Sequence, residues 1–195
     1  MSKKWIFFDP LSFSLQPKRV EIKVSKLDLE SWYEGRLRAL CLATSQAQAY
    51  GVTLAEQARS IDLKSEAAMV SDIFGDYGMT IRSFLRGLND APLVYDDRVM
   101  TSIVQEAQRI TDHSHSLGVS VLAQISGMVG VLTYCARAFQ EASELAKSLN
   151  LHDQSIDFQW MHDECGAYKY KCDLMSKRLR AAILSHFTEC VPTTV

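Results

Sequence analysis

The stretch that decides the fold is Ser155–Glu189, SIDFQWMHDECGAYKYKCDLMSKRLRAAILSHFTE. Apolar residues recur in it at alternating spacings of four and three, which is typical of a helix that packs against other helices. We call this row of residues the seam: Met161, Cys165, Tyr168, Cys172, Met175, Leu179, Ala182 and His186. Ile183 and Phe187 widen the seam into the broader stripe of a bundle helix. The pattern predicts one long amphipathic helix in the last third of the chain.

A helix of this length would span roughly 50 Å at 1.5 Å per residue. That is longer than a small globule can cover, so the seam predicts a partner surface. The partner could be the rest of this chain or a second copy of it. The candidate interaction residues lie on or beside the seam: Met161, Tyr168, Met175, Leu179, Ile183 and Phe187.

Helical periodicity continues through most of the preceding chain. A first helix is expected from near Asp28 to a stop at Gly51. A second is expected at Thr53, because Thr53 and Glu56 have the spacing of a capping box. The stretch Gly75–Gly78 predicts a break, followed by a shorter helix to Leu88 and a loop over residues 87–92.

Further helices are expected after this loop. One begins at Asp96 or Asp97, whose carboxylates suit a helix N-terminus. The pattern weakens at His113–Gly118, which predicts a turn or kink, so that residues 96–149 could form one helix or two. Val119–Leu149 is helical again, Asn150 is the expected cap, and the last helix is expected to start at Asp153 or Ser155.

The N-terminal region is the one place where apolar residues alternate with a period of two. Two such runs flank residues 16–18, which predicts a β-hairpin. The expected fold is therefore mainly α, a bundle of about five or six helices with a small N-terminal β-hairpin. We expect a single domain over 1–195, with the hairpin in 1–25, the bundle in 26–190 and a flexible tail in 191–195.

Residues 113–136 form a stretch of 24 residues without a formal charge, between Asp112 and Arg137. Its core is long enough to approach the span of a bilayer. A central helix buried on all sides has the same composition, so core helix and membrane insertion both remain possible. In the second case Val121, Ile125, Val129 and Leu132 would enter lipid. Ser126 and Gly130 form a small-xxx-small pair that allows close helix approach.

Two pairs of residues have the spacing of helix-borne zinc ligands or of a nucleophile beside its base. They are His162 with Cys165, and His186 with Cys190. On one straight helix the pairs would lie more than about 30 Å apart, so they cannot share a metal. Phosphate-binding loops and di-iron Glu-x-x-His motifs do not occur. We expect no catalytic, metal or cofactor site.

The net charge of −2 does not favour a nucleic-acid binder. The basic residues of the last helix between Lys169 and Arg180 spread over more than one face, and Asp163, Glu164 and Asp173 dilute their field. Nucleic acid is therefore an unlikely partner. Five cysteines, an odd and scattered set, predict free thiols in a reducing compartment, and no signal peptide is recognisable. We expect a cytoplasmic protein.

These observations favour a non-catalytic function through protein–protein interaction, as an adaptor, regulator or assembly subunit that self-associates as a homo-oligomer. The alternative is a membrane-active bundle that inserts residues 113–136 into lipid. In its long helices and uncharged stretch, the chain resembles α-helical pore-forming toxins. This resemblance is one of architecture and includes no shared motif, so no residue roles follow from it.

Overall fold

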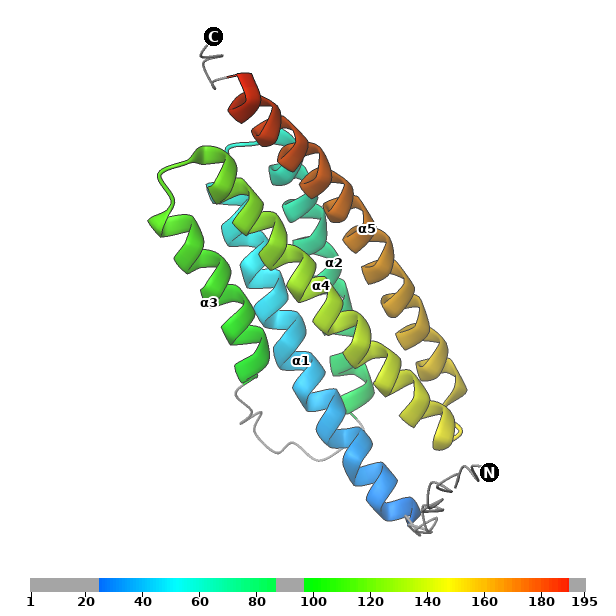
Figure 1. Ribbon diagram of the computed structural model, residues 1–195. Helices are drawn as coiled ribbons and strands as arrows, with labels where there is room; N and C mark the ends of the chain where they lie inside the picture. The colour runs from blue at the N-terminus through cyan, green and yellow to red at the C-terminus, as the bar shows by residue number, and fades with distance from the viewer. Residues whose placement is uncertain (1–24, 87–96, 190–195) are drawn as a thin grey trace, which may run out of the picture.

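The computed structural model describes residues 25–86 and 97–189, and within these ranges the chain forms five α-helices and no strand (Figure 1). The mainly α fold is therefore confirmed. The predicted β-hairpin, the predicted loop at 87–92 and the predicted tail at 191–195 lie outside the described residues. The helices are α1 (Lys26–Gln57), α2 (Ile61–Leu85), α3 (Arg98–His113), α4 (Leu117–Ser148) and α5 (His152–Glu189).

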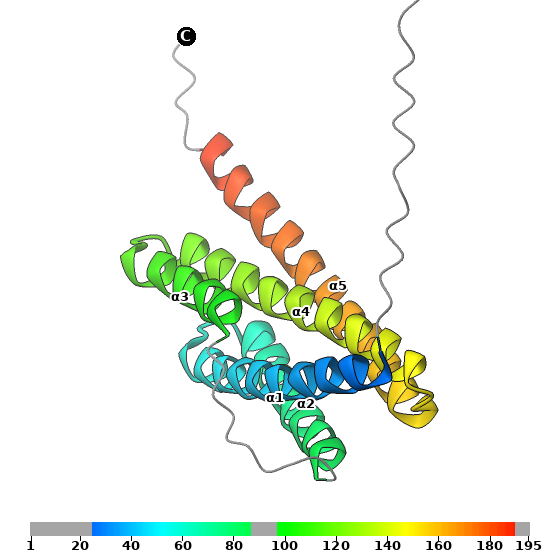
Figure 2. The same ribbon diagram turned by 90° about the horizontal axis from the view of Figure 1, so that it is seen from below.

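Three short connections arrange the helices as antiparallel neighbours. Residues 58–60 join α1 to α2, residues 114–116 join α3 to α4, and residues 149–151 join α4 to α5. Helices α1 and α4 lie in the middle of the bundle (Figures 1 and 2). The Tyr50 hydroxyl donates to the Gln124 carbonyl oxygen at 3.2 Å across this central contact. Figure 2 shows that α5 crosses α4 at an angle and that its C-terminal end leaves the other helices.

Polar caps define where several helices begin. Ser25 and Asp28 form a reciprocal capping box at α1, with the Asp28 amide 3.2 Å from Ser25 Oγ. The Asp97 carboxylate accepts from the Met100 amide at 3.0 Å, which confirms the predicted start of the third helix. At the turn after α4, Asn150 takes a positive φ of 61°, and the Leu151 amide donates to the Ala146 carbonyl at 2.9 Å. The predicted Asn150 cap is confirmed, and α5 begins at His152, one residue before the first of the two predicted starts, Asp153 and Ser155.

The predicted break at Gly51 and the predicted break at Gly75–Gly78 are wrong, because α1 and α2 run straight through them. These glycines serve close packing between the two helices. A Cβ atom at Gly51 would lie 2.9 Å from Ser71 Cβ, and one at Gly78 would lie 3.3 Å from Thr44 Oγ1. A larger residue would push the helices apart.

The capping box predicted at Thr53 is also wrong. Thr53 lies inside α1, and its hydroxyl donates to the Ala49 carbonyl at 3.0 Å. The real start of α2 is Ile61, after the cap residue Ser60. The shorter helix predicted from Thr80 is the end of α2.

Residues 98–148 form two helices, so the predicted turn near His113–Gly118 is confirmed. Helix α3 approaches α4 over two glycines. A Cβ atom at Gly127 would lie 2.5 Å from Ala107 Cβ, and one at Gly130 would lie 2.8 Å from Ile103 Cγ2. The close contact therefore uses Gly127 and Gly130, whereas Ser126 of the predicted small-xxx-small pair is exposed.

Aromatic rings fill the core from the middle of the bundle toward the α4–α5 turn. Phe158 stacks on Phe139 at a centroid distance of 6.3 Å, and Tyr77 meets Phe139 edge-on at 5.4 Å. The Tyr77 hydroxyl donates to Glu164 Oε2 at 2.7 Å, and burial raises the pKa of Tyr77 well above its usual range. This cluster brings together side chains from α1, α2, α4 and α5. Its rings are Tyr33, Phe74, Tyr77, Phe84, Phe139, Phe158 and Trp160.

Candidate functional site

The seam of α5 changes its surroundings along the helix. Over residues 152–172, which we call the packed half, Met161, Cys165 and Cys172 are each only 1% exposed. The Cys172 thiol donates to Met128 Sδ on α4 at 3.5 Å. In the packed half the seam is therefore filled by this chain's own helices.

Over residues 173–185, which we call the open half, the seam is covered on one side only. Met175, Leu179 and Ile183 are half-buried, and Ala182 is exposed. The contact with α4 continues here, since a Cβ atom at Gly118 would lie 2.9 Å from Ile183 Cδ1. On the side of the open half that faces α2, the described part of the chain makes no comparable helix contact.

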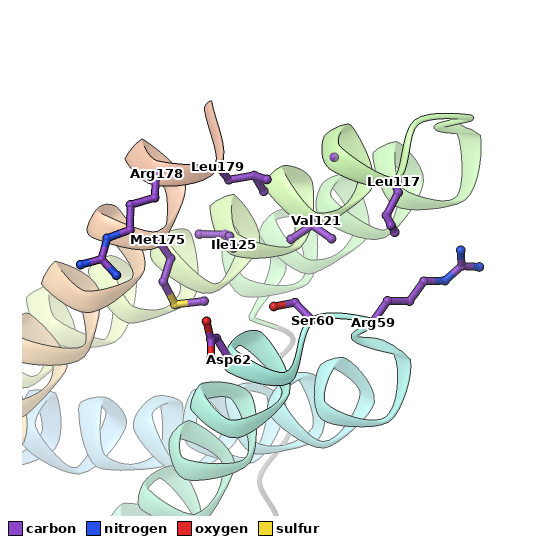
Figure 3. Close-up of a pocket in the computed structure, with 10 residues that line it drawn as sticks. Arg59, Ser60, Asp62, Leu117, Val121, Ile125, Met175, Arg178 and Leu179 are labelled. Atoms are coloured by element: carbon purple, nitrogen blue, oxygen red, sulfur yellow. The ribbon is translucent and has the colours of Figure 1, made fainter. Parts of the chain in front are cut away.

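A cavity of about 520 Å³ lies where α5 and α2 separate, and we call it the groove. Its walls come from the α1–α2 turn, the first turns of α4 and the open half of α5 (Figure 3). Leu117, Val121 and Met175 point into it in this view. Its lining residues are Arg59, Ser60, Asp62, Leu117, Gly118, Val121, Ile125, Met175, Arg178 and Leu179.

The apolar lining has helical spacing on both walls. Val121 and Ile125 are four residues apart on α4, and Met175 and Leu179 are four residues apart on α5. Residues at this spacing lie one above the other on a helix face. The apolar lining of the groove therefore comes from one face of α4 and one face of α5.

Charged side chains border the groove unevenly. Arg178 stands at the α5 edge and Asp62 on the α2 side (Figure 3). Residues 174–188 contain three basic residues, Lys177, Arg178 and Arg180, and no acidic residue. Closer to the packed half, Lys171 Nζ lies 3.8 Å from Glu66 Oε2, which joins α5 to α2 where the groove begins. The α5 edge is thus basic and exposed.

The structure brings together four of the residues singled out in the sequence. Two were predicted to bind a partner, and two were predicted to enter lipid if the protein inserts into membranes. Met175 and Leu179 meet Val121 and Ile125 in the groove. The remaining candidates lie elsewhere. Met161 and Leu132 are buried in the core, Val129 and Tyr168 are half-buried beside it, Ile183 packs on Gly118, and the Phe187 side chain lies outside the described part.

Sequence reasoning missed the α1–α2 turn as a wall of the groove. The predicted boundary at Gly51–Thr53 placed this turn several residues too early, so Arg59 and Asp62 seemed to lie within a helix. Ser60, followed by Asp62, is a valid N-cap signal and could have located the turn.

The pair His162 and Cys165 serves packing. His162 Nδ1 donates to the Ala136 carbonyl oxygen at 2.9 Å, which ties α5 to α4. Burial raises the pKa of the Cys165 thiol to about 12, so the thiol stays protonated and is a poor nucleophile at neutral pH. Within the described ranges, no three or more His, Cys, Asp or Glu residues gather as metal ligands.

Helix α4 is long and apolar enough to cross a membrane by length and composition. A window of 18 residues in it has a mean hydropathy of 1.6, and 44% of that window is buried in the bundle. The central helix of a bundle also has these properties. Of the four residues expected to enter lipid, Ile125 and Leu132 are buried and Val121 and Val129 are half-buried.

Comparisons of this chain with protein families, with curated proteins and with solved structures find no match.

Proposed function

We propose that this protein is a non-catalytic binding module that receives an amphipathic helix of a partner protein in the groove. The observation that carries the proposal is the change along α5, where one continuous apolar seam is filled in its first half and open in its second. A helix with an apolar stripe and acidic flanks is the occupant that we propose.

The shape of the groove favours a helix. Apolar pairs at i,i+4 spacing on two helices, Val121/Ile125 and Met175/Leu179, line the groove. An amphipathic helix fits an apolar groove of this kind with anchors at i, i+3, i+4 and i+7. The incoming helix would continue the helix-on-helix packing that α2 provides to the packed half.

The charges favour an acidic partner over a second copy. Two copies paired symmetrically through the open half would bring Lys177, Arg178 and Arg180 close to the same residues of the other copy. Like charges across an interface oppose association, whereas glutamates on a partner helix would face these side chains favourably. A hetero-association is therefore the form of protein–protein interaction that we propose.

The test uses two synthetic helical peptides with the same apolar stripe, one flanked by glutamates and one by lysines. The full chain is expected to bind the glutamate peptide at least tenfold more tightly, a difference of about 1.4 kcal/mol. Leu179→Asp should abolish this binding, because it places a carboxylate in the apolar channel. Ile156→Asp is the matched control, since Ile156 is an exposed apolar residue on the packed half of the same helix.

Three results would contradict the proposal. One is equal binding of both peptides, and another is equal loss of binding in Leu179→Asp and Ile156→Asp. The third is a dimer, seen by gel filtration with light scattering, that Leu179→Asp dissociates, since this would assign the groove to a second copy.

A second candidate function is insertion of α4 into a membrane, which the mean hydropathy of 1.6 over an 18-residue window and the absence of charged residues from 117–136 favour. Insertion would require α4 to leave its contacts with α1, α3 and α5. Leakage of anionic liposomes on addition of the protein, reduced by Leu132→Asp and not by Ile156→Asp, would support this function. Intact liposomes at both neutral and acidic pH would exclude it.

A further inference from the structure

The face of α5 opposite the seam carries a second row of residues with coiled-coil spacing, and we call it the outer row. Its members recur at alternating spacings of three and four, which places them on one face of the helix. Trp160 and Tyr170 are 58% and 64% exposed, Ala167 is exposed and Leu174 is half-buried, so the other described helices leave this face largely open. Figures 1 and 2 show α5 at the edge of the bundle. The outer row consists of Trp160, Asp163, Ala167, Tyr170, Leu174 and Lys177.

The flank of the outer row that faces α2 changes its charge along the helix. It consists of residues 157, 164, 171 and 178, which are seven residues apart and therefore lie on one side of α5. The first two are Asp157 and Glu164, and the last two are Lys171 and Arg178. Glu164 and Lys171 each contact α2 as well, while Asp157 and Arg178 form no ion pair within the described ranges. The flank is therefore acidic toward one end of the helix and basic toward the other.

An antiparallel pair of α5 helices would bring complementary side chains of the outer row together. With the two-fold axis at the middle of the row, Ala167 lies opposite Tyr170 of the second copy, so a small side chain meets a large one. The same register places Lys177 opposite Trp160 of the second copy, where an ammonium group over an indole ring forms a cation–π contact. Gly166 leaves room for this approach, since a Cβ atom there would meet nothing within 4 Å. The outer row is therefore self-complementary in shape.

The charged flank is self-complementary in the same register. Asp157 would lie beside Arg178 of the second copy, and Glu164 beside Lys171 of the second copy. Each of these pairs forms twice because of the two-fold axis. A parallel pair of helices would instead place each charge beside the same charge of the other copy, which opposes association. The order of charges along α5 therefore selects a second copy, in the antiparallel direction, as the partner for this face.

The other charges of this face fit the same arrangement. On the opposite flank, Gly166 would lie across from Asp173 of the second copy, and Asp173 is already paired with Lys169 at 2.9 Å. Within the outer row, Asp163 would lie diagonally across from Lys177 of the second copy, which offsets its charge.

We infer that this protein forms an antiparallel homodimer through the outer row of α5. The inference does not depend on what occupies the groove, because the outer row lies on the face of α5 opposite the seam. The groove is lined by the open half of the seam and stays available to another partner.

Sedimentation equilibrium of the full chain tests the dimer. A dimer is expected at tens of micromolar, and Tyr170→Asp should weaken it at least about tenfold, because it places a carboxylate at the centre of the row. The Tyr170 side chain is exposed in a single copy, so circular dichroism should show that the variant stays folded. Leu179→Asp, in the groove, should leave the dimer intact. A strictly monomeric chain at tens of micromolar, or a dimer that Tyr170→Asp leaves unchanged, overturns the inference.

Charge reversal on the flank tests the direction of the pair. Asp157→Arg brings two guanidinium groups together and Arg178→Asp two carboxylates, so each variant should dimerise about tenfold more weakly. Mixed in equal amounts, the two variants should associate with each other, since every opposed pair then has opposite charges. Glu144→Arg, at an exposed position of α4, is the matched control and should leave the affinity unchanged.

Three results of the charge reversal overturn the inference. They are single variants that dimerise as tightly as the original protein, a mixture that restores no association, and a Glu144→Arg variant that weakens the dimer equally. Peptide binding in the groove is measured separately, so either proposal can fail alone.

Discussion

The packed and open halves of α5 have the same apolar pattern and different neighbours. Met161 and Met175 occupy equivalent positions two heptads apart. Met161 is 1% exposed among the other helices, whereas Met175 lines the groove. The packed half faces an aromatic cluster to which α1, α2 and α4 contribute, while the open half packs on α4 and borders the groove. This difference along the seam is the basis of our proposal that the open half binds a partner.

The largest effect that separates the two halves should come from truncating these two methionines. Met161→Ala is expected to lower the free energy of unfolding by about 2–5 kcal/mol, because it leaves a cavity in the core. Met175→Ala should lower it by less than about 1 kcal/mol, since the side chain already borders open space. Urea denaturation of both variants measures the difference, and equal losses would mean that the two halves are packed alike.

Alkaline pH should act on the packed half through its two thiols. Burial raises the pKa of Cys165 to about 12 and that of Cys172 to about 11, above the ordinary value of 9.0. Above pH 9 the unfolded chain loses these protons while the folded chain keeps them, so stability should fall by up to about 1.4 kcal/mol per pH unit and thiol. Urea denaturation at pH 9 and 10 tests this, and Cys165→Ala should reduce the slope. A slope that this variant leaves unchanged would contradict the assignment.

Tyr77 links α2 to the packed half through its hydrogen bond to Glu164. Tyr77→Phe keeps the ring contacts with Phe139 and Trp160 and removes only the hydroxyl. We expect a loss of about 1–2 kcal/mol in the free energy of unfolding, because the acceptor is a carboxylate. Thermal unfolding followed by circular dichroism would detect it. An unchanged midpoint would show that ring packing alone holds α2 here.

The smallest effect is expected at the boundary between the halves. Lys171 and Glu66 are 3.8 Å apart and partly exposed. Lys171→Met should change the free energy of unfolding by less than about 1 kcal/mol, because exposed ion pairs contribute little. A large loss in urea denaturation would mean that this pair, and not the aromatic cluster, sets where α2 and α5 separate.

The sequence was sufficient to predict most of the helices and the position of α5, because periodicity and caps are local signals. Asp97, Asn150 and the seam each marked a boundary or a face correctly. Gly51 and Gly78 misled because glycine is read as a helix stop, while here it permits close contact with Ser71 and Thr44 across the α1–α2 interface. That role depends on a neighbouring helix and is not visible in local sequence.

The groove could be predicted only in part for the same reason. Met175 and Leu179 stand out on the seam, and Val121 and Ile125 stand out in the uncharged stretch. Their meeting in one cavity depends on how α5 crosses α4, which no local pattern encodes. Arg59 carried no signal in the sequence, because it is an ordinary turn residue that belongs to no motif.

Amide hydrogen exchange along α5, with and without the glutamate-flanked peptide, tests the central claim most directly. Without peptide, residues 158–172 should be well protected and residues 176–185 should exchange faster, since exchange follows local packing. With peptide, the protection of residues 176–185 should rise while that of residues 158–172 stays the same. Uniform protection along α5 without any partner, or an open half that the peptide leaves unprotected, would contradict the account.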